Sequence, residues 1–548
     1  MVGGRRPKSI SINPWTAVSF LLTAVLLLPI LAVFWAAAGD SEGLWPHLLE
    51  TTLPRYLLNT LALTGGVSIF ALLFGVTSAW LVTRYQFPGR RILEWTLLLP
   101  AAVPAYLIAY TYTDFLEYAG PVQGLFRDLF GWRSARDYWF PEIRSMGGAA
   151  FVMGAVLYPY VYMMTRTAFL ATPASLYEIG IISRRSVFWS VALPLARPAI
   201  VAGLAPVVME TISDFGTVEY FAIETLTLGV FNVWLGMNNL PAAAQIASLT
   251  FLFVIALIAL ERAARARQKF TNPSRRQTVL PRRRLKGLHA LLALTACATP
   301  IVVGFVVPVG VLLSFVLKGY SLGFSDAMLS AAVNALELAA VAAVVVMATA
   351  LVLGVVGRYL AGPGTRRLTA LASVGYAFPG AVLAIGVVTA GGALDDGIAW
   401  IKAALFGLDH AGWFASGFIL VAFACVVRFQ AIGYGAVASS LARMPPSMLE
   451  ASRTLGRGFG QSLLRVIAPL LRPALLAGGI LVFVDVLKEL PMTLLLRPFN
   501  FETLATFVYQ YARDELLEEA ALPALAIVGA GIIPVIVLNA AISHAMKK

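Results

Sequence analysis

The sequence predicts an all-α membrane protein of about twelve transmembrane helices in two homologous six-helix halves. Three observations lead to this prediction. Hydrophobic residues make up 59% of the chain and charged residues only 13%, whereas a soluble domain carries about 25% charged residues. Apolar runs long enough to cross a bilayer follow one another along the whole chain. Short polar motifs recur in the same order in the two halves.

The apolar runs divide evenly about a basic segment. Most reach or exceed the roughly 20 residues that a helix needs to span a bilayer. Six precede the basic segment, at about 15–38, 57–82, 92–112, 147–170, 199–221 and 242–260, and six follow it, at about 288–317, 331–360, 368–390, 413–438, 474–496 and 520–542. We therefore predict a first transmembrane half at 1–260, a linker at 261–287 and a second transmembrane half at 288–548.

The first run has two interpretations. It follows the basic residues Arg5, Arg6 and Lys8, as the apolar core of a secretory signal peptide would, and Ala36-Ala37-Ala38 would serve as a cleavage site. The apolar core of a signal peptide is only about 7–15 residues long. The run at 15–38 is longer, so we interpret it as a retained first span.

Positive charge predicts the orientation. Lys and Arg gather in the N-terminal segment, in alternate loops, in the linker and at Lys547 and Lys548, while the intervening loops hold carboxylates such as Asp40 and Glu518. Basic loops stay on the cytoplasmic side of a membrane. We therefore expect a multi-pass protein of the bacterial inner membrane, with both termini and the linker in the cytoplasm and the loop at 114–145 outside.

The linker at 261–287 carries ten Lys or Arg residues. Such a segment would suit binding to anionic lipid headgroups or to nucleic acid. It would equally serve as an inside-facing anchor that joins two halves. We favour the anchor, and we attribute the net charge of +13 to such loops rather than to a nucleic-acid partner.

The two halves carry matching motifs. An even number of spans in each half gives both the same orientation, which allows a parallel repeat about an axis along the membrane normal. The matching motifs are Asn59-Thr60-Leu61 with Asn334-Ala335-Leu336, Arg90-Arg91 with Arg366-Arg367, Glu224-Thr225-Leu226 with Glu502-Thr503-Leu504, and Val230-Phe231 with Val508-Tyr509.

A polar, basic segment between two apolar runs of the second half predicts a short helix. Pro445-Pro446 ends the preceding run, and Ser447 and Glu450 have the spacing of a capping box at a helix start. Gly456 is placed to end this helix. A second helix is expected to run toward Pro469.

The first half contains a shortened copy of this segment. Ser175, Glu178 and Pro194 repeat Ser447, Glu450 and Pro469. From Glu450 to Pro469 is nineteen positions, but from Glu178 to Pro194 is only sixteen. Loss of three residues shortens a helix by about 4.5 Å and turns the residues after it by about 300°. We expect the first helix to form but to end differently from the second.

The sequence Glu450-Ala451-Ser452-Arg453-Thr454-Leu455-Gly456, followed by Ala468-Pro469, resembles the EAA loop of ABC importer permeases. In that family the loop forms a coupling helix that docks into a groove on the ATPase subunit. The resemblance implies that Glu450, Ala451 and Gly456 shape the second coupling helix and that Glu178 shapes the first. It also implies two ATPase subunits on the cytoplasmic side and a periplasmic substrate-binding protein on the other.

Two pairs of carboxylates follow the coupling segments. Glu210 and Asp214 in the first half, and Asp485 and Glu489 in the second, are each four residues apart, so each pair is expected on one helix face. Ionisable groups in a span are costly and usually face a pathway or a bundle interior. Two interpretations stay open: acidity near the outer mouth of a cation pathway, or an outer interface in which Lys488 neutralises a neighbour.

The stretches at 210–221 and 485–493 resemble the fused permeases of ferric-iron importers, as do those at 228–237 and 507–511. This resemblance extends over nearly the whole chain and implies transport of ferric iron that the binding protein delivers. Permeases for thiamine or a phosphonate share the fused layout and are the alternative. Tyr158, Tyr160 and Tyr162 would suit ferric iron as ligands, but we favour an aromatic belt near a helix end.

Signatures of other protein classes are absent from the sequence. No G-x-x-x-x-G-K-[ST] motif occurs, so we expect ATP hydrolysis on a separate subunit. The four histidines lie at span ends or in loops, so we predict no catalytic residues, no cofactor and no metal site. Cys297 and Cys425 lie in apolar runs and are expected to be buried. An ion-coupled secondary transporter would also use in-span carboxylates and a twofold repeat, but it would not need two coupling segments. A membrane-anchored scaffold would not need in-span carboxylates at repeated positions.

Overall fold

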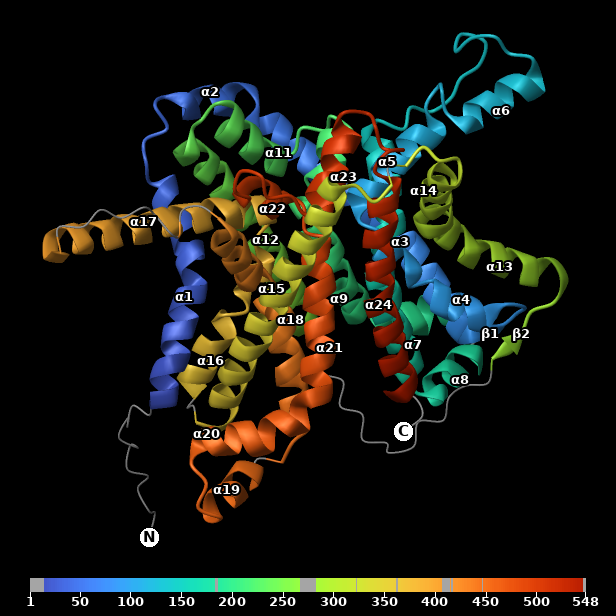
Figure 1. Ribbon diagram of the computed structural model, residues 1–548. Coiled ribbons are helices and arrows are strands. Elements are labelled where there is room, and N and C mark those ends of the chain that lie inside the picture. Colours follow the sequence, from blue (N-terminus) through green and yellow to red (C-terminus); the bar gives the residue numbers. More distant parts are fainter. Residues whose placement is uncertain are drawn as a thin grey trace. The chain divides into compact units, whose positions relative to one another are not determined.

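The computed structural model describes residues 14–182, 186–266, 282–321, 323–360, 363–406, 414, 417–445 and 447–545. These residues are helical almost throughout (Figure 1), and the prediction of an all-α protein is confirmed. The strands in the described part of the chain are β1 (Tyr85–Gln86) and β2 (Arg283–Arg284), each of two residues, and they pair in parallel.

Before the linker, the helices are α1 (Pro14–Ala37), α2 (Leu44–Thr51), α3 (Leu53–Arg84), α4 (Arg90–Thr96), α5 (Ala105–Leu116), α6 (Pro121–Phe130), α7 (Met146–Ala171), α8 (Ala174–Ile182), α9 (Leu193–Ser213), α10 (Gly216–Tyr220), α11 (Leu226–Phe231) and α12 (Leu240–Ala266). After it come α13 (Gly287–Ile301), α14 (Val307–Leu317), α15 (Asp326–Tyr359), α16 (Pro363–Leu371), α17 (Gly380–Phe406), α18 (Phe418–Leu441), α19 (Ser447–Thr454), α20 (Phe459–Ser462), α21 (Ala468–Leu487), α22 (Pro491–Leu496), α23 (Leu504–Arg513) and α24 (Ala521–Ala545).

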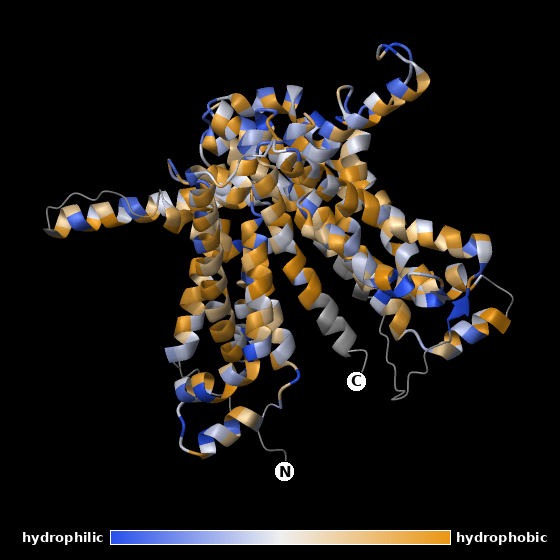
Figure 2. Cartoon of the chain, turned by 45° about the vertical axis from the view of Figure 1, so that its right-hand side comes forward, coloured by the Kyte–Doolittle hydropathy of each residue, from blue (hydrophilic) through white to orange (hydrophobic). Residues whose placement is uncertain are grey.

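The long helices have the length and composition of membrane spans. In the described ranges, nine helices meet both criteria, and a bent pair, Arg90–Ala102 with Ala105–Phe130, brings the number to ten. Shorter apolar helices cover Leu240–Ala256 and Ala521–Val537, within the last predicted run of each half. Figure 2 shows apolar residues covering most of the length of these helices. The total of about twelve spans stays a prediction.

Two of the predicted runs are broken at equivalent places. The run at 92–112 is interrupted by a 3₁₀ helix, η1 (Leu99–Ala102), and the run at 368–390 by another, η5 (Val374–Ala377). Pro104 and Pro379 follow these 3₁₀ helices, and a proline disfavours helical geometry in the residue before it. The prediction of one continuous span at each place was therefore wrong, and the second of these spans begins only at Gly380.

Equivalent distortions also precede α9 and α21. A π segment, η2 (Phe188–Ala192), leads into α9, and another, η6 (Leu463–Ile467), leads into α21. Pro194 and Pro469 are the second residues of these helices. A proline removes a backbone donor and crowds the preceding turn, and a π segment is one way in which a helix accommodates that. Two further π segments are η3 (Asn232–Gly236) and η4 (Val302–Val306).

The chain forms two compact units, each assembled from several segments. One contains Met1–Ala32, Leu338–Tyr376 and Gly386–Val486, and the other contains Val33–Glu337, Ala377–Ile385 and Leu487–Lys548. In the second unit, α3 packs closely on α7: a Cβ at Gly154 would lie only 2.5 Å from the Cβ of Phe70. The division of the sequence into halves at 1–260 and 288–548 rests on its repeated motifs and stays a prediction.

The end of the linker has a structure that the sequence did not predict. Tyr85 pairs with Arg283 and Gln86 with Arg284, and the N–H of Leu285 donates to the carbonyl of Gln86 over 2.9 Å. This strand pairing attaches the linker's last residues to the segment that follows α3. Residues 267–281 of the linker lie outside the described ranges.

Candidate functional sites: coupling helices and a polar cavity

The predicted second coupling helix is present as α19. Its end has the hydrogen bonds of a Schellman motif: the N–H of Gly456 donates to Arg453 over 2.9 Å, and that of Arg457 donates to Ser452 over 3.3 Å. Gly456 has a φ of +78°, a conformation that an L side chain rarely adopts. The prediction that Gly456 ends this helix is confirmed.

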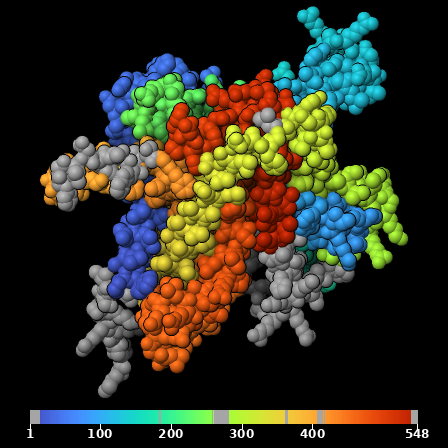
Figure 3. Space-filling view, in the orientation of Figure 1, coloured from blue at the N-terminus to red at the C-terminus, as the bar shows by residue number. Residues whose placement is uncertain are grey.

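One face of α19 is buried and the other is exposed. Leu449 and Ser452 are buried, and the hydroxyls of Ser452 and Ser462 share a hydrogen bond of 2.7 Å that ties α19 to α20. The segment from α19 to α20 lies at the surface in the space-filling view (Figure 3). Its exposed side chains include Glu450, Ala451, Arg453 and Leu455, the last of which is 81% exposed.

The base of this segment contacts the first helix of the chain. The ring of Trp15, in α1, lies 5.4 Å from that of Phe459, in α20. A Cβ at Gly460 would lie 3.0 Å from the Trp15 ring. The start of α1 therefore supports the second coupling segment, although the two are more than 400 positions apart in the sequence.

The predicted first coupling helix, α8, has a different surface. It continues through Gly180 to Ile182, and a Cβ at Gly180 would lie 2.9 Å from Val191, so this glycine serves packing rather than helix termination. Ser175 and Glu178 are exposed. Beside them are four exposed apolar side chains: Leu176, Ile179, Ile181 and Ile182. The counterparts of the last two in α19 are the polar residues Arg453 and Thr454. Residues 183–185, after α8, lie outside the described ranges.

The predicted coupling helices start within two residues of the positions that their capping signals indicate. α8 begins at Ala174, so Ser175 lies in its first turn, and α19 begins at Ser447. Helix boundaries vary by one or two residues between criteria. The reciprocal capping bonds of Ser175 with Glu178 and of Ser447 with Glu450 stay a prediction.

The acidic pairs do not share a helix face. α9 ends at Ser213 and α21 ends at Leu487, so Asp214 and Glu489 lie beyond the helices that carry Glu210 and Asp485. Both carboxylates instead accept hydrogen bonds at the start of the next short helix. Asp214 accepts from the N–H groups of Thr217 and Val218 over 3.0 and 3.1 Å, and Glu489 accepts from Met492 over 3.1 Å.

This arrangement corrects the expectation of a shared face and gives it a physical reason. A helix start presents free N–H groups that a carboxylate satisfies well. Asp214 and Glu489 thus play the same local role in the two halves, at the starts of α10 and α22. Their place in a translocation pathway, together with Glu210 and Asp485, stays a prediction.

A cavity of about 190 Å³ lies among α5, α10 and α23. Its lining combines phenol, carboxylate and guanidinium groups, and we call it the polar cavity: Tyr110, Arg144, Glu219, Tyr220, Tyr509, Arg513 and Glu515. The hydroxyl of Tyr509 donates a hydrogen bond to Glu219. The charge of Arg513 also acts on Glu219.

Arg144 closes one side of the polar cavity. Its guanidinium forms ion pairs with Glu117 at 2.7 Å and with Glu515 at 3.5 Å. It also lies 4.7 Å from the centre of the Tyr220 ring, a cation–π contact. No sequence pattern predicts this site, because its residues are spread over about 400 positions. A carboxylate at Glu219 and a tyrosine at Tyr509 were visible in the ferric-permease stretches, but no signal placed them together.

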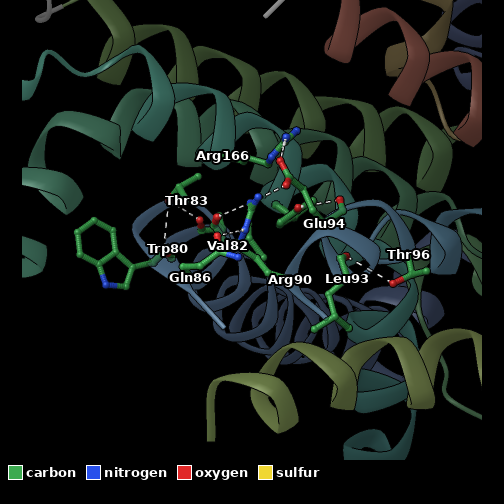
Figure 4. A network of polar contacts seen from close by, with 11 residues as sticks. Trp80, Val82, Thr83, Gln86, Arg90, Leu93, Glu94, Thr96 and Arg166 are labelled. Atoms are coloured by element: carbon green, nitrogen blue, oxygen red, sulfur yellow. Dashed lines mark hydrogen bonds and ion pairs between the residues drawn. The ribbon is translucent and has the colours of Figure 1, made fainter. Parts of the chain in front are cut away.

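A buried ion cluster joins α4 to α7 (Figure 4). Arg90 binds Glu94 at 2.7 Å and the carbonyl of Val82 at 3.1 Å, and Arg166 forms an ion pair with the same glutamate. Both arginines are nearly buried, with side chains 6% and 5% exposed. The second half has Arg366 at the position of Arg90, but alanines, Ala370 and Ala438, at those of Glu94 and Arg166.

The tyrosines of α7 belong to this packing. Tyr158 donates to the carbonyl of Leu97 over 2.8 Å, and Tyr162 to that of Glu94 over 3.0 Å. Both are fully buried, so the interpretation of an aromatic belt was wrong for them, and their hydroxyls are already engaged.

Cys297 and Cys425 are buried, as the sequence predicted.

Comparison with known proteins adds the family. A family model described as the inner membrane component of binding-protein-dependent transport systems matches residues 350–548. The chain is 23% identical over 533 residues to the Fe(3+)-transport system permease protein FbpB 2 of Haemophilus influenzae, which covers 96% of this chain and 97% of that protein.

Two shorter relatives match part of the chain. The sulfate transport system permease protein CysT of Escherichia coli is 30% identical over 236 residues, 41% of this chain and 81% of that protein. The molybdate/tungstate transport system permease protein WtpB of Thermococcus kodakarensis is 24% identical over 254 residues, 44% of this chain and 92% of that protein. The chain therefore belongs to the family of ABC importer permeases, the inner membrane components of binding-protein-dependent transport systems, in agreement with its apolar helices.

Proposed function

We propose that the chain is the membrane subunit of an ATP-driven importer of ferric iron. The observation that carries the ATP coupling is α19, a short helix with a buried face held by Ser452 and an exposed face that includes Glu450 and Arg453. Such a helix is suited to docking on another protein. No ATP-binding motif occurs in the sequence, so an ATPase on a separate subunit is the partner that would use it.

The preference for iron is supported by the extent of the match. The ferric permease of Haemophilus influenzae aligns with both halves of the chain, whereas the sulfate and molybdate permeases align with less than half of it. A chain with both halves fused therefore has its full-length counterpart in a ferric system. Sulfate, molybdate, thiamine and phosphonates are the alternative substrates.

The mechanism follows from two coupling helices on one chain. One ATPase subunit would bind α8 and a second would bind α19, on the cytoplasmic side, where the positive-inside rule predicts both termini. Closure of the ATPases on ATP would move both helices and turn the spans outward, as a rigid-body change between two states. A periplasmic binding protein would then release iron into the opened pathway, where Glu210, Asp214, Asp485 and Glu489 would attract the cation.

Reconstituted uptake tests the proposal. The chain, its ATPase and its binding protein would be placed in proteoliposomes, and entry of radiolabelled ferric iron would be followed with and without ATP. We expect uptake that requires ATP and the binding protein and that excess sulfate, molybdate or thiamine leaves unchanged. Uptake that persists without ATP and collapses with an ionophore would identify a secondary transporter. Inhibition by one of the competing solutes would assign that solute as the substrate.

A further inference from the structure

The polar cavity lies apart from the predicted coupling helices and from the ion cluster of α4 and α7. Its residues come from separate elements: Tyr110 from α5, Glu219 from α10, and Tyr509 from α23. Its volume of about 190 Å³ has room for an ion with several waters, since one water occupies about 30 Å³ in the liquid. The cavity is therefore large enough for a ligand.

One buried hydroxyl in the wall of the cavity has no hydrogen-bond partner among the described residues. Tyr110 is 1% exposed, and its hydroxyl makes no hydrogen bond to any described residue. Its ring packs edge-on against Tyr220 at 4.5 Å, which limits how far the hydroxyl can move. A buried hydroxyl without a partner costs about 1–3 kcal/mol. A ligand in the cavity that binds oxygen atoms would remove this cost.

The side chains of Tyr110, Glu219 and Tyr509 come from both sequence repeats, and none of their polar groups recurs at the equivalent position of the other repeat. By the offsets that relate Asp214 to Glu489, Phe231 to Tyr509 and Pro104 to Pro379, the counterparts of Glu219, Tyr509 and Tyr110 are Leu494, Phe231 and Ile385. All three counterparts are apolar. If Tyr110, Glu219 and Tyr509 served only packing, apolar residues would suffice at these positions, as they do at the three counterparts. The oxygen atoms of Tyr110, Glu219 and Tyr509 therefore occur at only one of the two sets of equivalent positions. This is what a single binding site on one transport route requires.

We propose that the polar cavity is a transient site for ferric iron, with Glu219, Tyr509 and Tyr110 as oxygen ligands and Glu515 at its rim. This inference rests on the proposed function. Hard cations prefer carboxylate and other oxygen ligands, and a tyrosine oxygen also binds ferric iron in haem proteins. Each phenol that coordinates the ion releases one proton to water.

The two arginines make the site reversible. Arg144 pairs with Glu515 and Glu117, and Arg513 acts on Glu219 through its charge. They neutralise the carboxylates while the cavity is empty and weaken the hold on a cation, and a transport site must bind weakly enough to release its ion. An oxyanion would be repelled by the carboxylates of Glu219 and Glu515. The positive charges of Arg144 and Arg513 are already balanced by these carboxylates, so they would attract an oxyanion only weakly. The backbone of Glu515 has a φ of 60°, which is uncommon for any residue other than glycine.

Ferric binding to the purified full-length chain in lipid nanodiscs tests the inference. Ferric nitrilotriacetate would be titrated in, and the visible charge-transfer absorption of an iron–phenolate bond recorded. We expect a saturable band in the wild type, and binding that is weaker by about tenfold in Tyr509→Phe and Glu219→Gln, because each loses a ligand to a charged ion. Tyr511→Phe, on the same helix but outside the cavity lining, is the matched control and should bind like the wild type.

A third variant separates binding from folding. Tyr110→Phe removes a hydroxyl that has no partner, so its thermal stability should equal or exceed that of the wild type while its iron band weakens. Equal binding in wild type, Tyr509→Phe and Tyr110→Phe would overturn the site. So would tungstate binding that Arg513→Gln abolishes, since this would make it an oxyanion site.

The experiments distinguish failure of the proposed iron site from failure of the proposed iron import. Absence of the band in a chain that still supports ATP-dependent iron uptake in proteoliposomes overturns the site and leaves iron import standing. Absence of iron uptake, with uptake of another solute, overturns the proposed function. A band that follows the expected variant order, together with slowed iron uptake in Tyr509→Phe, supports both.

Discussion

The side-chain amide of Asn334 donates a hydrogen bond of 3.0 Å to the backbone carbonyl of Glu502. Asn59 makes the same bond, also of 3.0 Å, to Glu224. In both places the next residue, Thr225 or Thr503, is the N-cap of the following short helix. The two sequence repeats therefore form the same local structure. In the first repeat α3 is hydrogen-bonded to the loop before α11, and in the second α15 is hydrogen-bonded to the loop before α23.

These paired bonds predict paired effects on stability. Asn59→Ala and Asn334→Ala each remove one hydrogen bond to a backbone carbonyl, so each should lower the free energy of unfolding by about 1 kcal/mol. Thermal unfolding in detergent would measure both, with the exposed Asn232→Ala as the control. A large loss in one variant and none in the other would show that the repeat is not energetically equivalent.

The ion cluster of the first half predicts a larger effect. Glu94→Gln leaves the nearly buried Arg90 and Arg166 without their shared carboxylate, and breaking a buried ion pair in this way costs on the order of 3–5 kcal/mol. We expect a clear fall in the thermal unfolding temperature. Glu50→Gln, at an exposed glutamate, is the control. Equal unfolding temperatures for the two variants would mean that the cluster does not hold α4 to α7.

The two coupling helices should contribute unequally to transport. α19 has a polar exposed face and a complete Schellman motif, whereas α8 is exposed mainly through apolar side chains and has the shorter spacing. We therefore expect Glu450→Ala to reduce ATP-dependent iron uptake clearly more than Glu178→Ala. Equal damage, or greater damage from Glu178→Ala, would contradict the predicted asymmetry.

Neutralising the two capping carboxylates tests their place in the pathway. Asp214→Asn and Glu489→Gln keep an oxygen that can accept the N–H bonds of α10 and α22, but they remove the charge. If both residues attract the transported cation, the double variant should slow iron uptake more than it lowers the amount of protein in the membrane. A parallel fall in both quantities would mean that the two residues are structural.

The sequence was sufficient to predict the features that depend on local chemistry. The all-α class follows from hydrophobicity alone, and the end of α19 at Gly456 follows from a glycine's freedom to adopt a positive φ. The matched motifs, such as Asn59 with Asn334, identified positions that proved structurally equivalent. These are features in which neighbouring residues decide the outcome.

The sequence was not sufficient where distant segments meet. A spacing of four residues puts Glu210 and Asp214 on one face only if the helix continues through both. The helix ends between them, and Asp214 accepts hydrogen bonds at the start of α10 instead. Prolines at 104 and 379 were the missed signals for the two broken spans. The polar cavity combines residues from 110 to 515, and no local pattern predicts such an assembly.

The most direct test of ATP coupling through α19 is iron uptake by Gly456→Asp in the reconstituted system. No atom outside the neighbouring residues lies within 4 Å of a Cβ at this position, so the substitution costs backbone strain of about 1–2 kcal/mol and otherwise adds a charge only where the ATPase would dock. Gly319 is the matched control: its φ is +75°, its surroundings are equally open, and it ends α14 with the same pair of hydrogen bonds. We predict that Gly456→Asp and Gly319→Asp lose similar stability, but that only Gly456→Asp loses ATP-dependent uptake. Full uptake by Gly456→Asp, or equal loss in both variants, would contradict the account.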